Sequence, residues 1–310
     1  MKKFKVSVII PVYNAEKYIK AAIESALLQN EVGEVIVVED KSPDNSLQIC
    51  VDMALKNTRI RLYQHPDKQN HGAGASRNVG IMNARFDYIA FLDADDYYLK
   101  DRFKKDKELF SEFQYIDGVY NALGTDYYEE VENAMIPKRF ITTITKNIEP
   151  KDLFSTLVRG ESGWIHSNSI TVKKSVFDKM DLFDTYVDLV EDALMWIKVS
   201  SICNLMGGEI VHPVAMRGVH LQNRINNTAI LHHNKTIMFS KLLEWAIEKK
   251  LPLDKRRLLW SVYYQTNVNN LSRNRIKRLA SAIIEFYRYP FLLGYSEYYK
   301  IIPFLTRIIK

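Results

Sequence analysis

Short apolar runs alternate with amphipathic stretches through the first 92 residues, and no other feature constrains the fold as strongly. The runs span residues 6–12, 32–38, 60–64 and 88–92, of which 60–64 alternates apolar residues with Arg61 and ends in Gln64. Between the first two runs, apolar residues recur at helical spacing from Ile19 to Leu27. Strands that alternate with helices in this way are typical of a mostly parallel sheet with helices on both faces. We therefore predict an α/β, Rossmann-like fold.

Capping and turn residues indicate where the helices begin. Asn14 is a good N-cap for a helix over 15–29, and Ser42-Pro43 would start the next one. Further along we expect helices over 75–84, 99–113 and 192–201, a short helix from Pro150, and strands over 117–122, 169–172 and 208–216. Residues 232–289 read as successive helices. We predict a catalytic domain over 1–220 and a helical C-terminal region over 221–310.

Three carboxylates follow the fourth apolar run, at Asp93, Asp95 and Asp96. They lie where the predicted strand leaves the sheet, and open α/β sheets bind ligands at that edge. Crowded carboxylates suit Mg²⁺ or Mn²⁺, which proteins commonly share with substrate phosphates. The stretch therefore indicates a metal–diphosphate site. An acidic loop that caps the following helix explains the same residues equally well.

Other polar groups should meet the carboxylates at this edge. Residues 11–14 end the first strand, Glu39 and Asp40 end the second, and the glycine-rich stretch 72–80 opens a helix that carries Arg77. A carboxylate at Asp40 can accept from a nucleobase N–H or a ribose hydroxyl. A helix start with Arg77 can bind phosphate. Each group alone has a local structural explanation, but together they describe a site for a nucleoside diphosphate.

The N-terminal half resembles the family 2 glycosyltransferases, which have the GT-A fold. The matching motifs are Val-Ser-Val-Ile-Ile-Pro-Val-Tyr-Asn (6–14), Val-Ile-Val-Val-Glu-Asp-Lys-Ser-Pro-Asp-Asn-Ser (35–46), Gly-Ala-Gly-Ala-Ser-Arg-Asn-Val-Gly (72–80) and Phe-Leu-Asp-Ala-Asp-Asp (91–96). The sequence departs from the family pattern at Glu39, Lys41 and Ser76.

The resemblance implies an inverting transfer of a sugar from a nucleotide-sugar donor, with Mn²⁺ or Mg²⁺ as cofactor. It implies that Asp40 faces the base, Asp93 the ribose side and Asp95 the metal. The resemblance, and no single residue, also implies that the nucleotide is uridine diphosphate. The residues expected to bind the nucleotide-sugar are Pro11, Tyr13, Glu39, Asp40, Arg77, Asp93 and Ala94.

Inversion needs a base opposite the leaving group, and an acidic pair supplies two candidates. Glu191 and Asp192 precede a predicted helix, as in the family, and Asp192 is the first choice. The pair could also simply cap that helix. By resemblance, His220 binds the metal or touches the diphosphate, with Arg217 and Arg224 as weaker candidates. Trp164 and His166 could line the acceptor site or serve local packing.

The positive charge of the chain is concentrated at its C-terminal end. Residues 273–310 hold eight basic and two acidic side chains, which accounts for the net charge of +6. Basic residues interleaved with apolar and aromatic ones are typical of a helix at an anionic membrane surface. Packing on the catalytic domain or on a second subunit is the alternative, so a homo-oligomer is possible. No nucleic-acid-binding motif occurs.

The cysteine count and the lengths of the apolar segments indicate the cellular compartment. Cys50 and Cys203 are too few for a disulfide framework. The apolar stretch after the basic N-terminus is too short for a signal peptide, and no stretch reaches the roughly 18 apolar residues of a spanning helix. We expect a cytoplasmic protein, peripheral on the inner face of the membrane.

A glycosyltransferase that adds one sugar per encounter is the first functional hypothesis, since Gln222-Asn-Arg224-Ile departs from the Gln-x-x-Arg-Trp motif of processive relatives. It would move a hexosyl or N-acetylhexosaminyl group to a saccharide or lipid-linked saccharide in cell-envelope polysaccharide synthesis. One alternative is a sugar nucleotidyltransferase, which would need a glycine-rich loop in place of residues 11–14. Another is a non-catalytic nucleotide-sugar-binding protein at the membrane.

Overall fold

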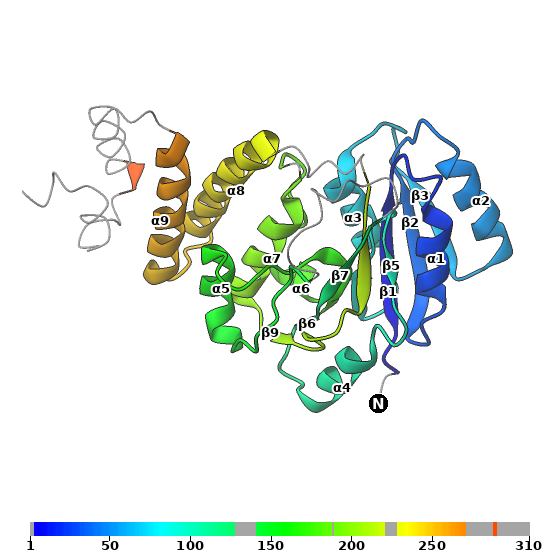
Figure 1. The fold of residues 1–310 in the computed structure, drawn as a ribbon, viewed down its shortest axis with the longest axis horizontal. Coiled ribbons are helices and arrows are strands. Elements are labelled where there is room, and N and C mark those ends of the chain that lie inside the picture. The colour runs from blue at the N-terminus through cyan, green and yellow to red at the C-terminus, as the bar shows by residue number, and fades with distance from the viewer. Residues whose placement is uncertain (1–2, 128–140, 188, 221–227, 271–287, 290–310) are drawn as a thin grey trace, which may run out of the picture. The chain divides into compact units, whose positions relative to one another are not determined.

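The computed structural model describes residues 3–127, 141–187, 189–220, 228–270 and 288–289 (Figure 1). The chain divides into two compact units, Met1–Asn226 and Asn227–Lys310. The sequence analysis places the boundary between the two regions a few residues earlier, at residue 220. All residues of the candidate site belong to the first unit.

The first unit is built on a seven-stranded sheet in the order β3-β2-β1-β4-β8-β6-β9. These strands are β3 (Ile60–Gln64), β2 (Val32–Glu39), β1 (Val6–Val12), β4 (Tyr88–Phe91), β8 (Ile170–Lys173), β6 (Gly118–Tyr120) and β9 (Leu205–Gly207). All neighbours pair in parallel except β8, which runs antiparallel to both β4 and β6. The predicted mostly parallel α/β sheet is confirmed.

Helices cover both faces of the sheet, which is why its strands are apolar on both sides. Figure 1 shows α1 (Ile19–Leu27) and α2 (Ser46–Lys56) on one side of β1–β3, and α3 (Gly72–Asn83) on the other. Val8 and Ile10 of β1 belong to the core that includes α1. Ile9 points the opposite way, toward Gly80 of α3. Successive residues of β1 therefore pack under different helices.

Two predicted helix starts are wrong. Helix α1 begins at Ile19 instead of residue 15, and Asn14 adopts a left-handed backbone (φ 52°) instead of capping it. Helix α2 begins at Ser46, after Asn45, so Ser42-Pro43 lies in the preceding loop. Helix α3 starts at Gly72, earlier than predicted, and α5 (Pro150–Arg159) begins with its proline as predicted.

A second, three-stranded sheet was not foreseen. It consists of β5 (Tyr97–Tyr98), β10 (Ala215–Val219) and β7 (Leu123–Tyr127), in that order. The predicted strand over 208–216 is wrong, because residues 208–214 form the connection between β9 and β10. The helix predicted over 99–113 is the shorter α4 (Lys104–Glu112). Among its described residues, this unit also has α6 (Val176–Lys179), α7 (Glu191–Ile202) and the short 3₁₀ turn η2 at Ser167–Ser169.

The second unit contains α8 (Thr228–Glu248) and α9 (Leu253–Asn270) among its described residues. Leu242, Leu243 and Trp260 are fully buried there, and the Trp260 and Tyr264 rings stack at 5.0 Å. The predicted helices from 232 onward are confirmed as far as Asn270. Residues 271–287 and 290–310, which hold most of the basic tail, lie outside the described residues. No helix in the described ranges is long and apolar enough to span a membrane.

Candidate active site

The carboxyl ends of β1, β2 and β4 meet at one edge of the sheet, because these strands are parallel neighbours. Tyr13 follows β1, Asp40 follows β2, and Asp93 lies just beyond β4. Helix α3 opens at the same edge, since it follows β3. The residues that the sequence analysis assigned to one site therefore lie at one edge of the sheet, although several of their contacts differ from those expected.

Asp95 and His220 lie together at this edge. His220 Nε2 is 3.1 Å from Asp95 Oδ2, and the His220 ring stacks on Tyr18 with centroids 5.1 Å apart. The Asp95 side chain is 32% exposed, so its carboxylate remains within reach of a ligand.

This pair fits a divalent cation. Within the described ranges, no group of three or more His, Cys, Asp or Glu side chains is placed to hold a metal. One carboxylate and one imidazole nevertheless match the donors that Mn²⁺ accepts, with substrate phosphates filling further positions.

Arg77 connects the acidic loop after β4 to the start of α7. Its Nη2 donates to Asp93 Oδ1 and its Nη1 to Glu191 Oε1, both at 2.7 Å, and Phe183 packs against the guanidinium at 5.5 Å. Burial alone would raise the pKa of Asp93, but Arg77, His166 and Arg217 together outweigh it and hold that pKa below its ordinary value. Arg77 was predicted to meet phosphate, whereas here both ends of its guanidinium bind carboxylates.

Glu191 and Asp192 begin α7 but have different environments. Glu191 is 9% exposed and is held by Arg77. Asp192 is only half-buried, and its Oδ1 accepts the N–H of Ala193 at 2.7 Å. Burial raises the pKa of Asp192, Arg77 opposes that rise, and the charge of Asp93 adds to it. Asp192 is therefore the better placed of the two to accept a proton.

The acids that end β2 are engaged with the backbone. Asp40 is 2% exposed, and its two oxygens accept the N–H groups of His71 (2.8 Å) and Gly72 (2.7 Å) at the start of α3. Glu39 accepts from the N–H of Ser42 and from Gln64. Asp40 was expected to face a base, but in this structure its carboxylate organises the turn into α3.

The other predicted donor-binding residues differ in exposure. Pro11 lies within β1 opposite Val38 and is buried, and Ala94 is part of the core. Tyr13 is 54% exposed just after β1. Of these residues, Tyr13 presents the largest surface on which a ring could stack.

Several residues near the site were missed or undervalued by the sequence analysis. His166 is half-buried, and its Nδ1 accepts the N–H of Asn168, so a neutral ring carries its proton on Nε2. Burial lowers the pKa of His166 to about 4. Burial is also the largest influence on the pKa values of Asp93 and Asp192, and the charge of Arg217 lowers all three. Arg217, on β10, is therefore close enough to influence these groups, while Arg224 lies outside the described residues.

Asp96 and Asn168 hold the acidic loop in place. Asp96 is buried, and its Oδ1 accepts the N–H of Gly218 at 2.8 Å while its Oδ2 accepts from Asn168 Nδ2. Asn168 Oδ1 in turn accepts the N–H of Asp93 at 2.9 Å. Burial, reinforced by the charges of Asp95 and Asp93, raises the pKa of Asp96 well above its ordinary value. No sequence pattern identified Asn168.

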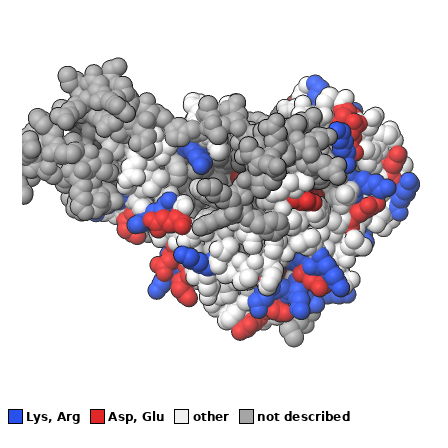
Figure 2. Space-filling model, in the orientation of Figure 1, with Lys and Arg blue, Asp and Glu red and all other residues white. Residues whose placement is uncertain are grey.

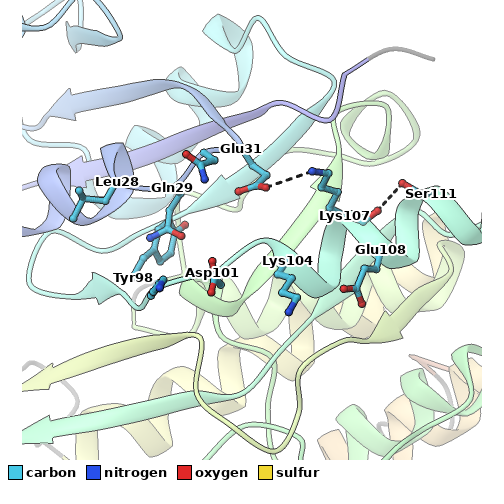
Figure 3. A pocket seen from close by; sticks show the side chains of 11 residues that line it. Leu28, Gln29, Glu31, Tyr98, Asp101, Lys104, Lys107, Glu108 and Ser111 are labelled. Carbon is cyan, nitrogen blue, oxygen red and sulfur yellow. Dashed lines mark hydrogen bonds and ion pairs between the residues drawn. The ribbon is translucent and has the colours of Figure 1, made fainter.

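A cavity of about 800 Å³ lies elsewhere (Figure 3). Leu28 to Glu31 line one side of it and immediately precede β2, whose other end carries Asp40. Its charged residues carry both signs, and Glu31 pairs with Lys107 at 3.8 Å. This cavity is therefore at the opposite edge of the sheet and has no part in the candidate site.

Residues 7–160 match the model of the family described as "Glycosyl transferase family 2". These residues form a family 2 glycosyltransferase domain. A glycosyltransferase of Rickettsia felis is 31% identical over 205 residues, which are 66% of this chain and 31% of that protein. One of Haemophilus influenzae is 41% identical over 101 residues, 32% of this chain and 40% of that protein. The chain thus spans less than half the length of these relatives.

Solved structures show the same fold. TarS 1–349 of S. aureus, in complex with UDP-GlcNAc, matches with a TM-score of 0.58 at 19% identity over 92% of this chain and 91% of its own. The mannosyltransferase PcManGT of Pyrobaculum calidifontis, in complex with GDP-Man and Mn²⁺, matches with a TM-score of 0.55 at 15% identity over 96% and 85%. At these identities the likeness shows the GT-A fold, as the sequence analysis predicted.

Proposed function

We propose that this family 2 domain transfers one sugar from a nucleotide-sugar donor to a saccharide or lipid-linked saccharide, with inversion at the anomeric carbon. The observation that carries the proposal is the approach of Asp95 to His220, 3.1 Å apart. They lie at the strand edge where Arg77 connects Asp93 to Glu191, the neighbour of Asp192 at the start of α7. Asp95 and His220 would hold Mn²⁺ or Mg²⁺. The bound ion would stabilise charge on the departing diphosphate as a Lewis acid.

Asp192 is the base in this proposal. Its carboxylate would take the proton of the acceptor hydroxyl, on the face of the sugar opposite the diphosphate. Glu191 is less suited to that role because Arg77 already binds it at 2.7 Å. Glu191 would instead fix the start of α7 and thereby the position of Asp192.

Arg217 is the cation that we assign to the diphosphate. Arg77 is committed to Asp93 and Glu191, whereas Arg217 extends from β10, the strand that leads to His220. A guanidinium beside a metal-bound diphosphate can bind two phosphate oxygens at once. Tyr13 would cover the base, and Asp93 would lie on the ribose side.

The donor is proposed to carry uridine diphosphate and a hexosyl or N-acetylhexosaminyl group. The likeness to proteins crystallised with UDP-GlcNAc or with GDP-Man and Mn²⁺ supports a nucleotide-sugar donor in general. We further propose a role in cell-envelope polysaccharide synthesis at the inner face of the membrane. The charge of residues 273–310 supports that location, and a homo-oligomer through the same segment is the alternative.

The direct test is nucleotide release from a panel of UDP-, GDP- and TDP-sugars, with and without Mn²⁺ and with mixed saccharide acceptors. We expect one nucleotide class to be released in a metal-dependent reaction, and Asp192→Asn to slow it about 100-fold or more. The product should have inverted anomeric configuration by NMR. Pyrophosphate-dependent formation of a nucleotide-sugar would instead identify a nucleotidyltransferase, and donor binding without turnover would identify a binding protein.

A further inference from the structure

Both carboxylate oxygens of Asp96, in the acidic loop, accept hydrogen bonds from donors of the protein. Gly218 N–H binds Oδ1 at 2.8 Å, and the Asn168 amide binds Oδ2. Asp96 is 4% exposed, and Asn168 is fully buried. A ligand at the site therefore meets Asp95, not Asp96, and Asp96 has a different task.

The contacts of Asn168 fix the direction of its amide. Its Oδ1 accepts the N–H of Asp93 at 2.9 Å, so its Nδ2 must face Asp96. One side chain from η2 thus holds the acidic loop at both of its ends. The N–H of Asn168 itself is bound by His166 Nδ1, which anchors the turn.

The contact from Asp96 to Gly218 connects the acidic loop to β10. Residues of β5, directly after Asp96, pair with β10 at Tyr97–Met216 and Tyr98–Ala215. The Asp96–Gly218 hydrogen bond extends this pairing toward His220, two residues after Gly218. The separation of Asp95 from His220 therefore depends on a short rigid path through Asp96.

We propose that Asp96 and Asn168 are positioning residues that set the spacing of Asp95 and His220 for the divalent ion. This inference rests on the proposed function, because it assumes that Asp95 and His220 bind a metal together with the nucleotide. Partners that orient metal ligands are typically worth about 10- to 100-fold in metal affinity. The pair would act on metal binding without touching the metal.

The hydrogen-bond pattern allows a sharp test by exchange of the two residues. With Asp96→Asn alone, two amide NH₂ groups face each other, and the hydrogen bond between the two side chains is lost. With Asn168→Asp alone, two buried carboxylates face each other. In the double variant, an amide at 96 can still accept from Gly218 and donate to a carboxylate at 168. That carboxylate can still accept from Asp93. All three contacts of the native pair are then restored.

The measurement is calorimetric binding of UDP, or of whichever nucleoside diphosphate the native chain binds, with and without Mn²⁺. We expect each single exchange to weaken metal-dependent binding about tenfold or more, and the double exchange to restore it within about threefold. Binding without metal should change little in all three variants. Melting temperatures, measured in parallel, report damage to the fold.

The matched control is Asn121→Asp, since Asn121 is another buried asparagine, bound to Asp106 at 2.9 Å. It should lower the melting temperature and leave the ratio of metal-dependent to metal-free binding unchanged. The proposal is overturned if the single exchanges bind like the native chain with Mn²⁺, or if the double exchange is no better than either. If the native chain binds no nucleotide at all, the proposed function itself fails.

Discussion

Glu191 and Asp192 are adjacent in the sequence, yet their surroundings separate their roles. Glu191 is bound by Arg77, while Asp192 keeps part of its surface and contacts the backbone of Ala193. The sequence could offer both as bases but could not rank them by environment, because the ranking depends on Arg77, 114 residues away along the chain. The sequence could predict which acidic residues lie near one another. It could not predict which of them binds Arg77.

The proposed role of Asp192 as the base predicts the pH dependence of the reaction. The base must be ionised, and burial raises its pKa above the ordinary value for aspartate, about 3.9. We expect kcat/KM to be lost as the pH falls through this raised pKa, with the acid limb above that of an exposed carboxylate. A pH–rate profile of Glu191→Gln should keep an acid limb, whereas the residual activity of Asp192→Asn should lack it. An unchanged limb in Asp192→Asn would assign the base elsewhere.

Arg77 should matter for stability as well as for the site. Arg77→Met leaves Asp93 and Glu191 without the cation that both bind at 2.7 Å in a largely buried setting. Loss of one partner from a buried ion pair costs roughly 3–5 kcal/mol. We therefore expect a free energy of unfolding lower by about 3 kcal/mol in urea titrations. Arg159→Met is the control, because Arg159 is exposed and 3.9 Å from Glu161, and should change it by less than about 1 kcal/mol.

At the scale of elements, strands were predicted better than helix starts. Runs such as 6–12 and 32–38 are buried strands, because apolar residues on both faces of a strand are stable only when both faces are covered. The polar residues expected to cap helices instead tie two loops together. Ser42 Oγ accepts the N–H of Asn14 at 3.2 Å, and Asp44 accepts that of Glu16 at 2.9 Å. These partners are distant in sequence, so local capping rules could not find them.

Packing of α3 on β1 gives a second stability prediction. A Cβ at Gly80 would lie 2.3 Å from Ile9 Cγ2, in a buried strand that cannot yield. Gly80→Ala should therefore destabilise the chain by about 1–3 kcal/mol, although alanine favours helices. Met82→Ala, at an exposed position of the same helix, should change the free energy of unfolding by less than about 0.5 kcal/mol. Equal effects of the two would show that this contact is not tight.

At the scale of the whole molecule, charge is distributed unevenly along the chain. On the face shown in Figure 2, basic and acidic residues of the described part are interspersed. The net charge of +6 equals the excess of residues 273–310, most of which lie outside the described residues. Their order of basic, apolar and aromatic residues is the reason to expect an anionic surface as partner.

Membrane binding is tested with the full chain and phosphatidylserine vesicles. Each basic residue near anionic lipid contributes about 1 kcal/mol, so removal of four should weaken partitioning by roughly a thousandfold. The test variant changes four basic residues of the tail to glutamine: Arg273, Arg275, Lys277 and Arg278. The control changes four exposed lysines of the first unit: Lys17, Lys20, Lys56 and Lys105. Equal cosedimentation of both variants would contradict a membrane role for the tail.

The central claim is a metal-dependent nucleotide site at Asp95, and calorimetry tests it most directly. UDP, GDP and TDP are titrated with and without Mn²⁺ into the native chain, into Asp95→Ala and into the control Asp52→Ala, which changes an exposed acid on α2. We expect one nucleotide to bind with Mn²⁺, the control to bind equally, and Asp95→Ala to lose the metal-dependent binding. Binding that needs no metal, or that survives in Asp95→Ala, would contradict the assignment of this edge as the metal–nucleotide site.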